Sequence, residues 1–394
     1  MSLRKIIREK LENYLTEVDW GGEFSDVKGQ CLNPNAVVKW LNDELNRIDT
    51  NKFGDKEDYK TRGKKDIIVT RGTIEDVMEN GSINLNNFIR NITMEPDRIF
   101  DHNPKMEKSD VGRPQLTVNT GLPAIVGIIY DIEHKKFYSV PTCPSAGSCQ
   151  IGCYARKGFY GMDNSKTMKL TRRLNLLFND PAKYKQMILS ELEPMAKRLK
   201  TSSVGIKEKM QLVIRCNDAG DFFGDRYFNI AREVTRELLD MGYNVKSYAY
   251  TKRAKYVIEL DKDKNFVINF STDAHKKDID QIAAYDVKKK LKRAHRVPKE
   301  LFNDIFMKEG PHYAKGHTGL PIFSSEDAPE ILKSRIYREY GKEFGIKKDS
   351  LVYTFELPRE IGSKNQYNVI VLTTGDSDIG AQRTDVKMSF LLFH

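Results

Sequence analysis

The sequence has little cysteine and no long apolar segment. Five of its 394 residues are cysteine, and no run approaches the roughly 18 apolar residues that a membrane-spanning helix needs. Residues 1–10 are charged and lack the apolar centre of a secretory signal peptide. We therefore expect a cytoplasmic protein, in a compartment where disulfides are rare.

Several common catalytic motifs are also absent. The chain contains no G-x-x-x-x-G-K-[ST] phosphate loop, no H-E-x-x-H zinc-protease motif and no G-x-S-x-G nucleophile turn. These absences argue against P-loop nucleotide hydrolysis, zinc proteolysis of that type and serine-hydrolase chemistry.

Positive charge is in excess. Lysine and arginine number 65 against 55 acidic residues, a net charge of +10 at pH 7. Such a balance favours a polyanionic partner, such as a nucleic acid or nucleotide. The strongest basic run, "KKKLKRAHR" at 288–296, is expected at the end of a long helix, 276–296, as either a solvated face or a phosphate-binding face.

The first part of the chain differs from the rest. Apolar residues recur at helical spacing between Leu3 and Val18 and again between Val37 and Ile48, and 49–65 is charged with almost no aliphatic residue. We expect residues 1–115 to form a small, mostly helical region with charged loops, and residues 116–394 to form the catalytic domain.

Strand and helix patterns alternate from Gln211 onward. Connections long enough to hold a helix make neighbouring strands parallel, so the predicted fold class is α/β, either a partial (β/α) TIM-like barrel or an open sheet. The predicted strands are 124–130, 136–140, 211–216, 245–250, 265–270, 351–355 and 369–373, the first two as a hairpin, and the predicted helices are 166–179, 227–241, 253–261 and 276–296.

Polar loops follow three of these strands: "NDAGDFF" at 217–223, "TKR" at 251–253 and "STDAH" at 271–275. The carboxyl ends of parallel strands meet at one edge of a sheet, where ligands bind. We therefore expect Asp218 and Asp273 to converge there with Asp221. The alternative is that these aspartates cap the helices that follow.

Three cysteines lie in "TCPSAGSCQIGCYARKGF", spaced C-x5-C-x3-C. In a reducing compartment this cluster indicates metal ligands or catalytic groups. Three thiolates can hold three irons of a cubane cluster and leave the fourth iron open, whereas structural zinc would need a fourth ligand, such as Cys216 or a histidine. Three unmodified buried thiols are the remaining alternative.

The segments "TCPSAGSCQIGCYARKG", "NDAGDFF" and "YAYTK" together resemble the phage gene product 88 family. The order of the cysteine loop and the polar strand ends also resembles radical S-adenosylmethionine enzymes. The resemblance covers about 115–273. The spacing departs from the C-x3-C-x2-C that is common in the radical family, and the C-terminal "IGAQRTDVKMSFLLFH" holds no cysteine for a second metal site.

This resemblance implies an iron–sulfur enzyme in which a reduced [4Fe-4S] cluster cleaves S-adenosylmethionine to a radical that abstracts hydrogen from a substrate. A nucleotide or nucleic acid is the first expected substrate, in the cytoplasm of a host bacterium if a phage encodes the chain. The implied metal ligands are Cys143, Cys149 and Cys153, the cofactor contacts are Tyr154, Gly220, Asp221, Thr251 and Ser271, and the catalytic candidates are Asp218, Lys252 and Asp273.

Two other hypotheses stay open. "NDAGDFF" is similar to the Asp-Ser-Gly-Gly-Phe motif of tRNA-guanine transglycosylases, which are also barrels. By that resemblance Asp218 contacts a base, Asp273 or Asp376 attacks the sugar, and the cysteines hold structural zinc, although that family has its cysteine site after the catalytic segments. The third hypothesis is a non-catalytic, zinc-stabilised nucleic-acid-binding protein, based on the net charge and the basic run.

Overall fold

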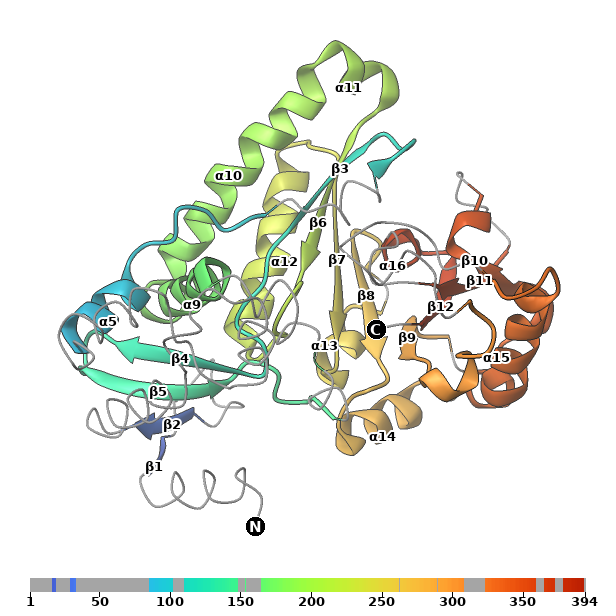
Figure 1. The fold of residues 1–394 in the computed structure, drawn as a ribbon. Coiled ribbons are helices and arrows are strands. Elements are labelled where there is room, and N and C mark those ends of the chain that lie inside the picture. The colour runs from blue at the N-terminus through green and yellow to red at the C-terminus, as the bar shows by residue number, and fades with distance from the viewer. Residues whose placement is uncertain are drawn as a thin grey trace.

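An eight-stranded, wholly parallel sheet forms the centre of the computed structural model (Figure 1). The structure describes residues 16–18, 29–32, 85–101, 110–147, 153, 164–261, 263–288, 290–307, 323–358, 365–372 and 378–392. In order across the sheet, the strands are β10 (Leu351–Tyr353), β11 (Tyr367–Val371), β12 (Val386–Leu391), β9 (Arg293–Arg296), β8 (Phe266–Ser271), β7 (Val245–Thr251), β6 (Gln211–Cys216) and β3 (Gln115–Asn119).

The α/β prediction is confirmed, and the sheet of the described residues is open, with β3 and β10 at its two edges. The sequence pattern explains why β6 to β8 lie at its centre. Each is a short, almost fully buried run rich in β-branched and aromatic residues, as expected of a parallel strand covered on both faces. The predicted strands at 211–216, 245–250 and 265–270 match these three elements within one residue.

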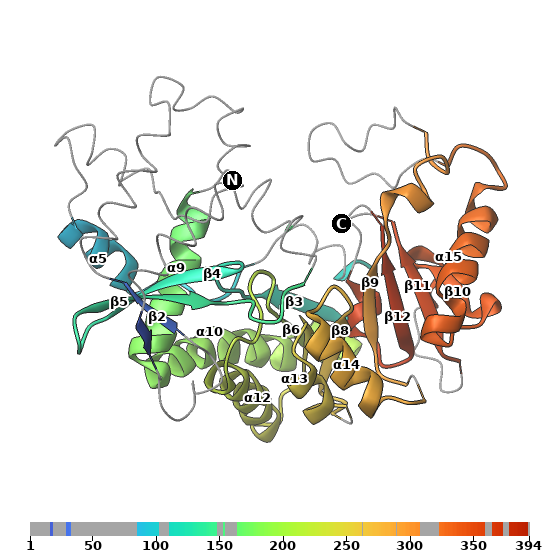
Figure 2. The same cartoon turned by 90° about the horizontal axis from the view of Figure 1, so that it is seen from below.

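Helices cover the outer face of the sheet (Figure 2). Outward-facing residues of β6, among them Leu212 and Ile214, pack with Phe228 and Val234 of α12 in one large apolar cluster. At the other end of the sheet, α15 packs on β10 to β12 in a second cluster. The helices of the main domain are α9 (Asn164–Asn179), α10 (Pro181–Thr201), α11 (Ser203–Glu208), α12 (Asp225–Asp240), α13 (Ala254–Glu259), α14 (Lys276–Tyr285), α15 (Ala328–Phe344) and α16 (Ile379–Gln382).

The inner face of the sheet carries the short helix α16. Its Ala381 packs on Val213 and Tyr248 of the central strands, whereas its Ile379 packs on Val369 of β11. The four-residue helix α16 therefore contacts both halves of the sheet on its inner face. This inner face is much more polar than the outer one, because strand residues alternate between the two faces and the inward set includes charged side chains.

A second, antiparallel sheet has the order β1 (Thr16–Val18), β2 (Gly29–Leu32), β5 (Lys136–Pro141) and β4 (Val126–Asp131). The predicted hairpin is confirmed as β4 and β5. Asn175 of α9 binds β4 through the Ile128 carbonyl at 2.9 Å. β1 lies at the end of a stretch for which the sequence predicts a helix, and α5 (Leu85–Thr93) is helical; most of 1–115 lies outside the described residues, so its mostly helical character stays a prediction.

The prediction of one helix over 276–296 is wrong beyond Tyr285. The Asp286 carboxylate accepts hydrogen bonds from the Lys290 and Leu291 amides, at 2.6 and 2.9 Å, and these bonds compete with continuation of the helix. The chain then enters β9, between β8 and β12. The spacing of the apolar residues in 286–296 therefore predicts a helix where the structure has a loop and a strand.

Much of the basic run is consequently internal. Lys292 donates from Nζ to the Gly380 and Val386 carbonyls, each at 2.6 Å. Arg293 is buried and pairs with Asp286 at 2.5 Å, and Arg296 pairs with Asp273 at 3.2 Å. The helix face predicted for 288–296, whether solvated or phosphate-binding, is therefore wrong, because α14 ends at Tyr285.

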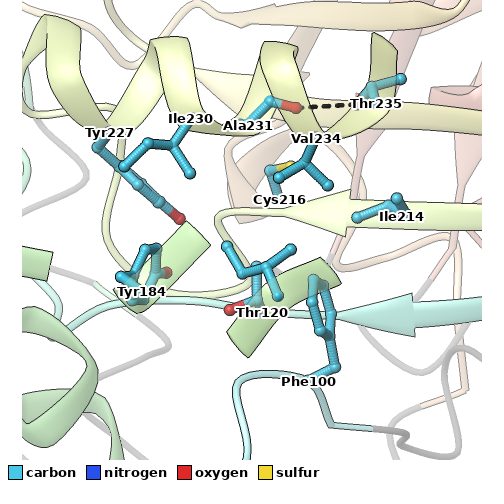
Figure 3. Close-up of a pocket in the computed structure, with 11 residues that line it drawn as sticks. Phe100, Thr120, Tyr184, Ile214, Cys216, Tyr227, Ile230, Ala231, Val234 and Thr235 are labelled. Carbon is cyan, nitrogen blue, oxygen red and sulfur yellow. Dashed lines mark hydrogen bonds between the residues drawn. The ribbon is translucent and has the colours of Figure 1, made fainter. Parts of the chain in front are cut away.

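A small cavity lies between α10, α12 and the outer face of β6 (Figure 3). Its volume of about 20 Å³ admits about one water molecule. The Tyr184 and Tyr227 hydroxyls are buried in its wall, and Cys216 lies beside them. It is too small for a substrate, so the functional site must lie elsewhere. None of the described helices has the length and apolar character needed to cross a bilayer.

The internal placement of Lys292 leads to a stability prediction. Changing Lys292→Met removes the donor for two carbonyl groups, and we expect the free energy of unfolding to fall by about 1–2 kcal/mol. Lys288→Met, on an exposed side chain of the same run, should change it by less than about 0.5 kcal/mol. Urea unfolding of both variants measures the difference, and equal effects would contradict the internal role.

Candidate functional site

The loop that carries Cys143 lies against the carboxyl edge of the parallel sheet. The Thr142 carbonyl accepts a hydrogen bond from the Asp221 amide at 2.8 Å, and the Ser145 carbonyl accepts one from the His275 amide at 2.7 Å. Gly147 donates to the Asp273 carbonyl at 3.0 Å, and a side chain there would collide with the backbone of the 271–275 loop. The loop is thus fixed to the ends of both β6 and β8.

Cys143 is half-buried at this edge in a polar backbone environment. Its Sγ accepts a hydrogen bond of 3.4 Å from the amide of Ile125, a β-branched residue whose φ of 70° is uncommon. Burial raises the pKa of Cys143 to about 12, although the Lys252 ammonium opposes the rise, while the Asp221 carboxylate adds to it. A thiol with this pKa is protonated at neutral pH, so it is a poor free nucleophile and would have to lose its proton to bind a metal.

The structure places Cys153 close enough to influence the pKa of Cys143. Cys149 and Tyr154 lie outside the described residues, and within the described part no three histidine, cysteine or carboxylate side chains gather as a metal-binding group. The three-cysteine centre therefore stays a prediction. Two thiols at one edge, one of them accepting an N–H···S bond, are a donor set that fits a thiolate-bound metal group.

Cys216 is in a different environment from Cys143. It packs in the apolar cluster on the outer face, beside Ile214 and Val234, and burial alone raises its pKa to about 12. Its place there gives no support to the idea that it completes a zinc site with the loop cysteines.

Asp221 has a fully buried carboxylate that joins two strand ends. Oδ1 accepts from the Phe222 amide at 2.7 Å and from Thr251 Oγ at 2.5 Å, and Oδ2 accepts from the Lys252 amide at 2.9 Å. Burial raises its pKa, opposed by the Lys252 ammonium and by these hydrogen bonds. The preceding Gly220 has a φ of 77°, a conformation that favours glycine. Asp221 therefore holds the loops after β6 and β7 together.

The predicted aspartates are not helix caps. The residue before α12 is Gly224 and the residue before α14 is His275. Asp273 instead pairs with Arg296, and Ser271 ends β8 nearby. The capping alternative therefore does not account for these carboxylates.

A second cluster lies on the inner face of the sheet. Arg215 Nη1 contacts Asp218 at 3.0 Å and Asp378 at 3.1 Å, so one guanidinium joins two carboxylates. Asn119 donates to Asp218 at 3.0 Å, and the Tyr248 hydroxyl donates to Asp378 at 3.0 Å. Sequence reasoning identified Asp218 but missed Asp378, while Asp376, the residue it considered, lies outside the described part.

Sequence reasoning also missed Asn217. This residue has a φ of 61° and is 5% exposed, and neither the oxygen nor the nitrogen of its side-chain amide has a hydrogen-bond partner among the described residues. The buried Thr142 hydroxyl likewise has no partner in the described part of the chain. Buried polar atoms without a protein partner are uncommon and generally bind water or a ligand. The strained backbone could not be read from the sequence, because asparagine is compatible with many conformations.

The described part therefore brings Cys143, Cys153, Asp221, Thr251 and Lys252 together at one end of the sheet. Asp218 faces the inner cluster with Asp378, and Asp273 joins the cysteine loop through its backbone. The site has charged, thiol and amide groups converging from four loops, an arrangement suited to ligand or metal binding.

A family model described as gene product 88 matches residues 99–316, which is more than half of the chain. The matched segment contains the cysteine loop and the loops after β6, β7 and β8, but not Asp378. No curated protein and no solved structure matches the chain.

The role of Asp221 predicts a specific loss of stability. Asp221→Asn replaces an acceptor oxygen by an NH₂ group that faces hydrogen-bond donors, so the free energy of unfolding should fall by about 1–3 kcal/mol. Asp273→Asn, which affects a partly exposed ion pair, should cost less than about 1 kcal/mol. Urea unfolding again provides the measurement. The assignment fails if Asp273→Asn is as damaging as Asp221→Asn.

Proposed function

This chain belongs to the gene product 88 family, and we propose that it is an iron–sulfur enzyme acting on a nucleotide or nucleic acid. Cys143, Cys149 and Cys153 would hold a [4Fe-4S] cluster, with S-adenosylmethionine bound beside it. The observation that carries this proposal is the attachment of the cysteine loop to the ends of β6 and β8. Parallel α/β proteins bind their ligands at that edge.

The cysteine loop also has the position in the chain that the proposal requires. It follows β3 and the inserted hairpin and precedes α9, so it belongs to the first connection between parallel strands, β3 and β6. The later strands β7, β8 and β9 then follow in order across the sheet, with helices outside. This half of the sheet is a suitable scaffold for a partial (β/α) barrel.

The residues around Cys143 fit a thiolate ligand. The Ile125 amide would stabilise negative charge on Sγ, and the nearby Lys252 ammonium would offset part of the charge of a thiolate-bound cluster. When bound and reduced, such a cluster supplies the electron that cleaves S-adenosylmethionine. Metal binding would displace the Cys143 proton, and the polypeptide would hold the half-buried thiol in place and limit its contact with water.

The cofactor would lie against the loops after β6, β7 and β8. Gly220 allows close approach of the backbone, and Tyr154, Thr251 and Ser271 are the other proposed contacts. Three donors already bind the Asp221 carboxylate, which leaves about one of its acceptor positions for the cofactor amino group. Asp221 would therefore orient Thr251 and Lys252 as well as contact the cofactor.

The substrate would enter from the inner face, where the polar residues lie. Asp218 and Lys252 are the proposed catalytic contacts, with Asp273 at the neighbouring strand end. The net charge of +10 and the phage family support a phosphorylated substrate. The basic run no longer does, because much of it is internal.

One observation favours a second candidate, a base-modifying enzyme similar to tRNA-guanine transglycosylases. Asp218 and Asp378 meet on the same guanidinium, so two carboxylates face one polar surface. In that function Asp218 would contact the base, Asp378 would attack the sugar and the cysteines would hold zinc. This function needs a fourth zinc ligand, and Cys216 is in the apolar cluster of the outer face.

Metal analysis tests the proposal. We expect about four irons and matching sulfide per chain in anaerobically purified protein, and the loss of most of this metal in Cys143→Ala. Cys216→Ala is the control, because this thiol lies in the apolar core away from the loop, and the metal content of the variant should equal the parent's.

Activity then separates the candidates. Reduced, iron-loaded protein should convert S-adenosylmethionine to 5′-deoxyadenosine, and Cys143→Ala should not. Stoichiometric zinc, together with enzymatic exchange of a base in RNA or DNA, would instead support the base-modifying enzyme and contradict the iron–sulfur enzyme. Equal metal in Cys143→Ala and Cys216→Ala would exclude a cysteine-loop centre of either kind.

A further inference from the structure

Three cations share one carboxylate in the segment between α5 and β3. Oδ1 of Asp101 lies 2.7 Å from Lys169 Nζ and 3.8 Å from Arg98 Nε. Oδ2 of the same carboxylate lies 2.8 Å from Arg173 Nη2. Lys169 and Arg173 belong to α9, which begins soon after the cysteine loop. We call Arg98, Asp101, Lys169 and Arg173 the Asp101 cluster.

The cluster is attached to the carboxyl end of the edge strand β3. The backbones of Asp101 and Asn119 exchange two hydrogen bonds, at 2.8 and 2.9 Å. Asn119 is the last residue of β3, and its side chain donates to Asp218 at 3.0 Å. The carboxylate of Glu191, in α10, accepts from the two amides that precede Asp101, at 2.5 and 3.0 Å. The cluster is therefore fixed beside Asp218, a residue of the candidate site.

Positive charge is in excess within this cluster. Burial opposes the shift, but the charges of Arg173 and Lys169 lower the pKa of Asp101 below its usual value, so this carboxyl is ionised at neutral pH. One carboxylate against three cations leaves an excess of two positive charges. The exposed Asp97 acts on another cation of α9, since burial lowers the pKa of Arg172 and the Asp97 charge raises it. An anionic ligand would complete the charge balance of the cluster.

Two of the three cations are accessible to a ligand. The side chain of Arg98 is 63% exposed and that of Lys169 is 22% exposed, whereas Arg173 is fully buried. Both accessible cations contact the same oxygen of Asp101, so their nitrogens are no farther apart than the sum of those two distances, which one phosphate group can span. Among the described residues the Lys169 ammonium has one acceptor, which leaves two of its three donors.

We propose that Arg98 and Lys169 form a binding subsite for a phosphate monoester group, such as the terminal phosphate of a nucleotide. A monoester dianion matches the two uncompensated charges, and its oxygens accept charge-assisted hydrogen bonds from both side chains. Asp101 and the buried Arg173 hold the two cations in place. The assignment of this phosphate to the substrate rests on the proposed function, because the cluster adjoins Asp218 through Asn119.

Binding at this subsite requires neither a metal nor chemistry at the cysteine loop. The Asp101 cluster includes no proposed metal ligand, cofactor contact or catalytic residue. Phosphate binding by a chain that holds no iron would support the subsite and leave the proposed function without support. An iron–sulfur enzyme that does not bind phosphate would keep the proposed chemistry and lose the subsite, so the two inferences fail separately.

Calorimetric titration of the full chain with inorganic phosphate tests the subsite, with chloride at matched ionic strength as the reference. Lys169→Met keeps the length of the side chain and removes its charge, and it should weaken phosphate binding by about tenfold or more. Lys169→Arg should keep most of the affinity. Lys183→Met is the matched control, because it makes the same change in charge at an exposed lysine of α10 that pairs with Glu95, and it should alter the affinity by less than about twofold.

Arg98→Met separates a phosphate subsite from a purely structural ion cluster. The Arg98 side chain is mostly exposed and its contact with Asp101 is 3.8 Å long, so its removal should leave the urea midpoint of unfolding at the parent's value. Phosphate affinity should nevertheless fall by about fivefold or more, because one of the two accessible charges is lost. Unchanged affinity in this variant would show that the cluster serves structure alone and would contradict the proposal.

Dimethyl phosphate, a diester with a single negative charge, tests which kind of phosphate the subsite takes. It should bind at least about tenfold more weakly than inorganic phosphate, because it leaves one positive charge uncompensated. Equal binding would assign the subsite to the diester backbone of a nucleic acid and contradict the monoester. The proposal is also overturned if the parent binds phosphate no better than chloride, or if Lys183→Met loses as much affinity as Lys169→Met.

Discussion

The arrangement of the candidate site depends on Asp221. Its amide binds the Thr142 carbonyl, which fixes the start of the cysteine loop, and its carboxylate binds Thr251 and the Lys252 amide, which fixes the end of β7. One buried residue thus positions the thiol loop and two strand ends. A carboxylate can remain buried here because hydrogen bonds and the Lys252 charge compensate for lost hydration.

Several arginines of the described part are paired internally and do not contribute to a basic surface. Arg215, Arg293 and Arg383 are all buried, and each binds at least one carboxylate on or beside the parallel sheet. Buried ion pairs of this type add little net stability compared with apolar residues, but loss of one partner is severely destabilising. They therefore fix which strands and loops lie together more than they increase stability.

The sequence correctly predicts strands whose own residues favour a buried strand. It fails for elements whose structure depends on a partner that is distant in the sequence. β6, β7 and β8 are short apolar runs between polar loops, and a sheet buried on both faces needs that pattern. The sequence predicts helix for the polar segment that contains β9. It forms a strand instead, where Arg293 pairs with Asp286 and the preceding Lys292 binds carbonyls near α16. Asp378 was missed for the same reason, since its partner Arg215 lies far away in the sequence.

The short helix α16 lies between two groups of polar contacts on the inner face. Asp378, just before it, binds Arg215 near the carboxyl ends of the strands, whereas the Gly380 carbonyl accepts from Lys292, and Arg383, just after the helix, pairs with Asp385. A helix rises about 1.5 Å per residue, so these few residues extend only a short way across the inner face. Contacts on both sides of α16 therefore fix its position on the inner face, although its own sequence carries no recognisable motif.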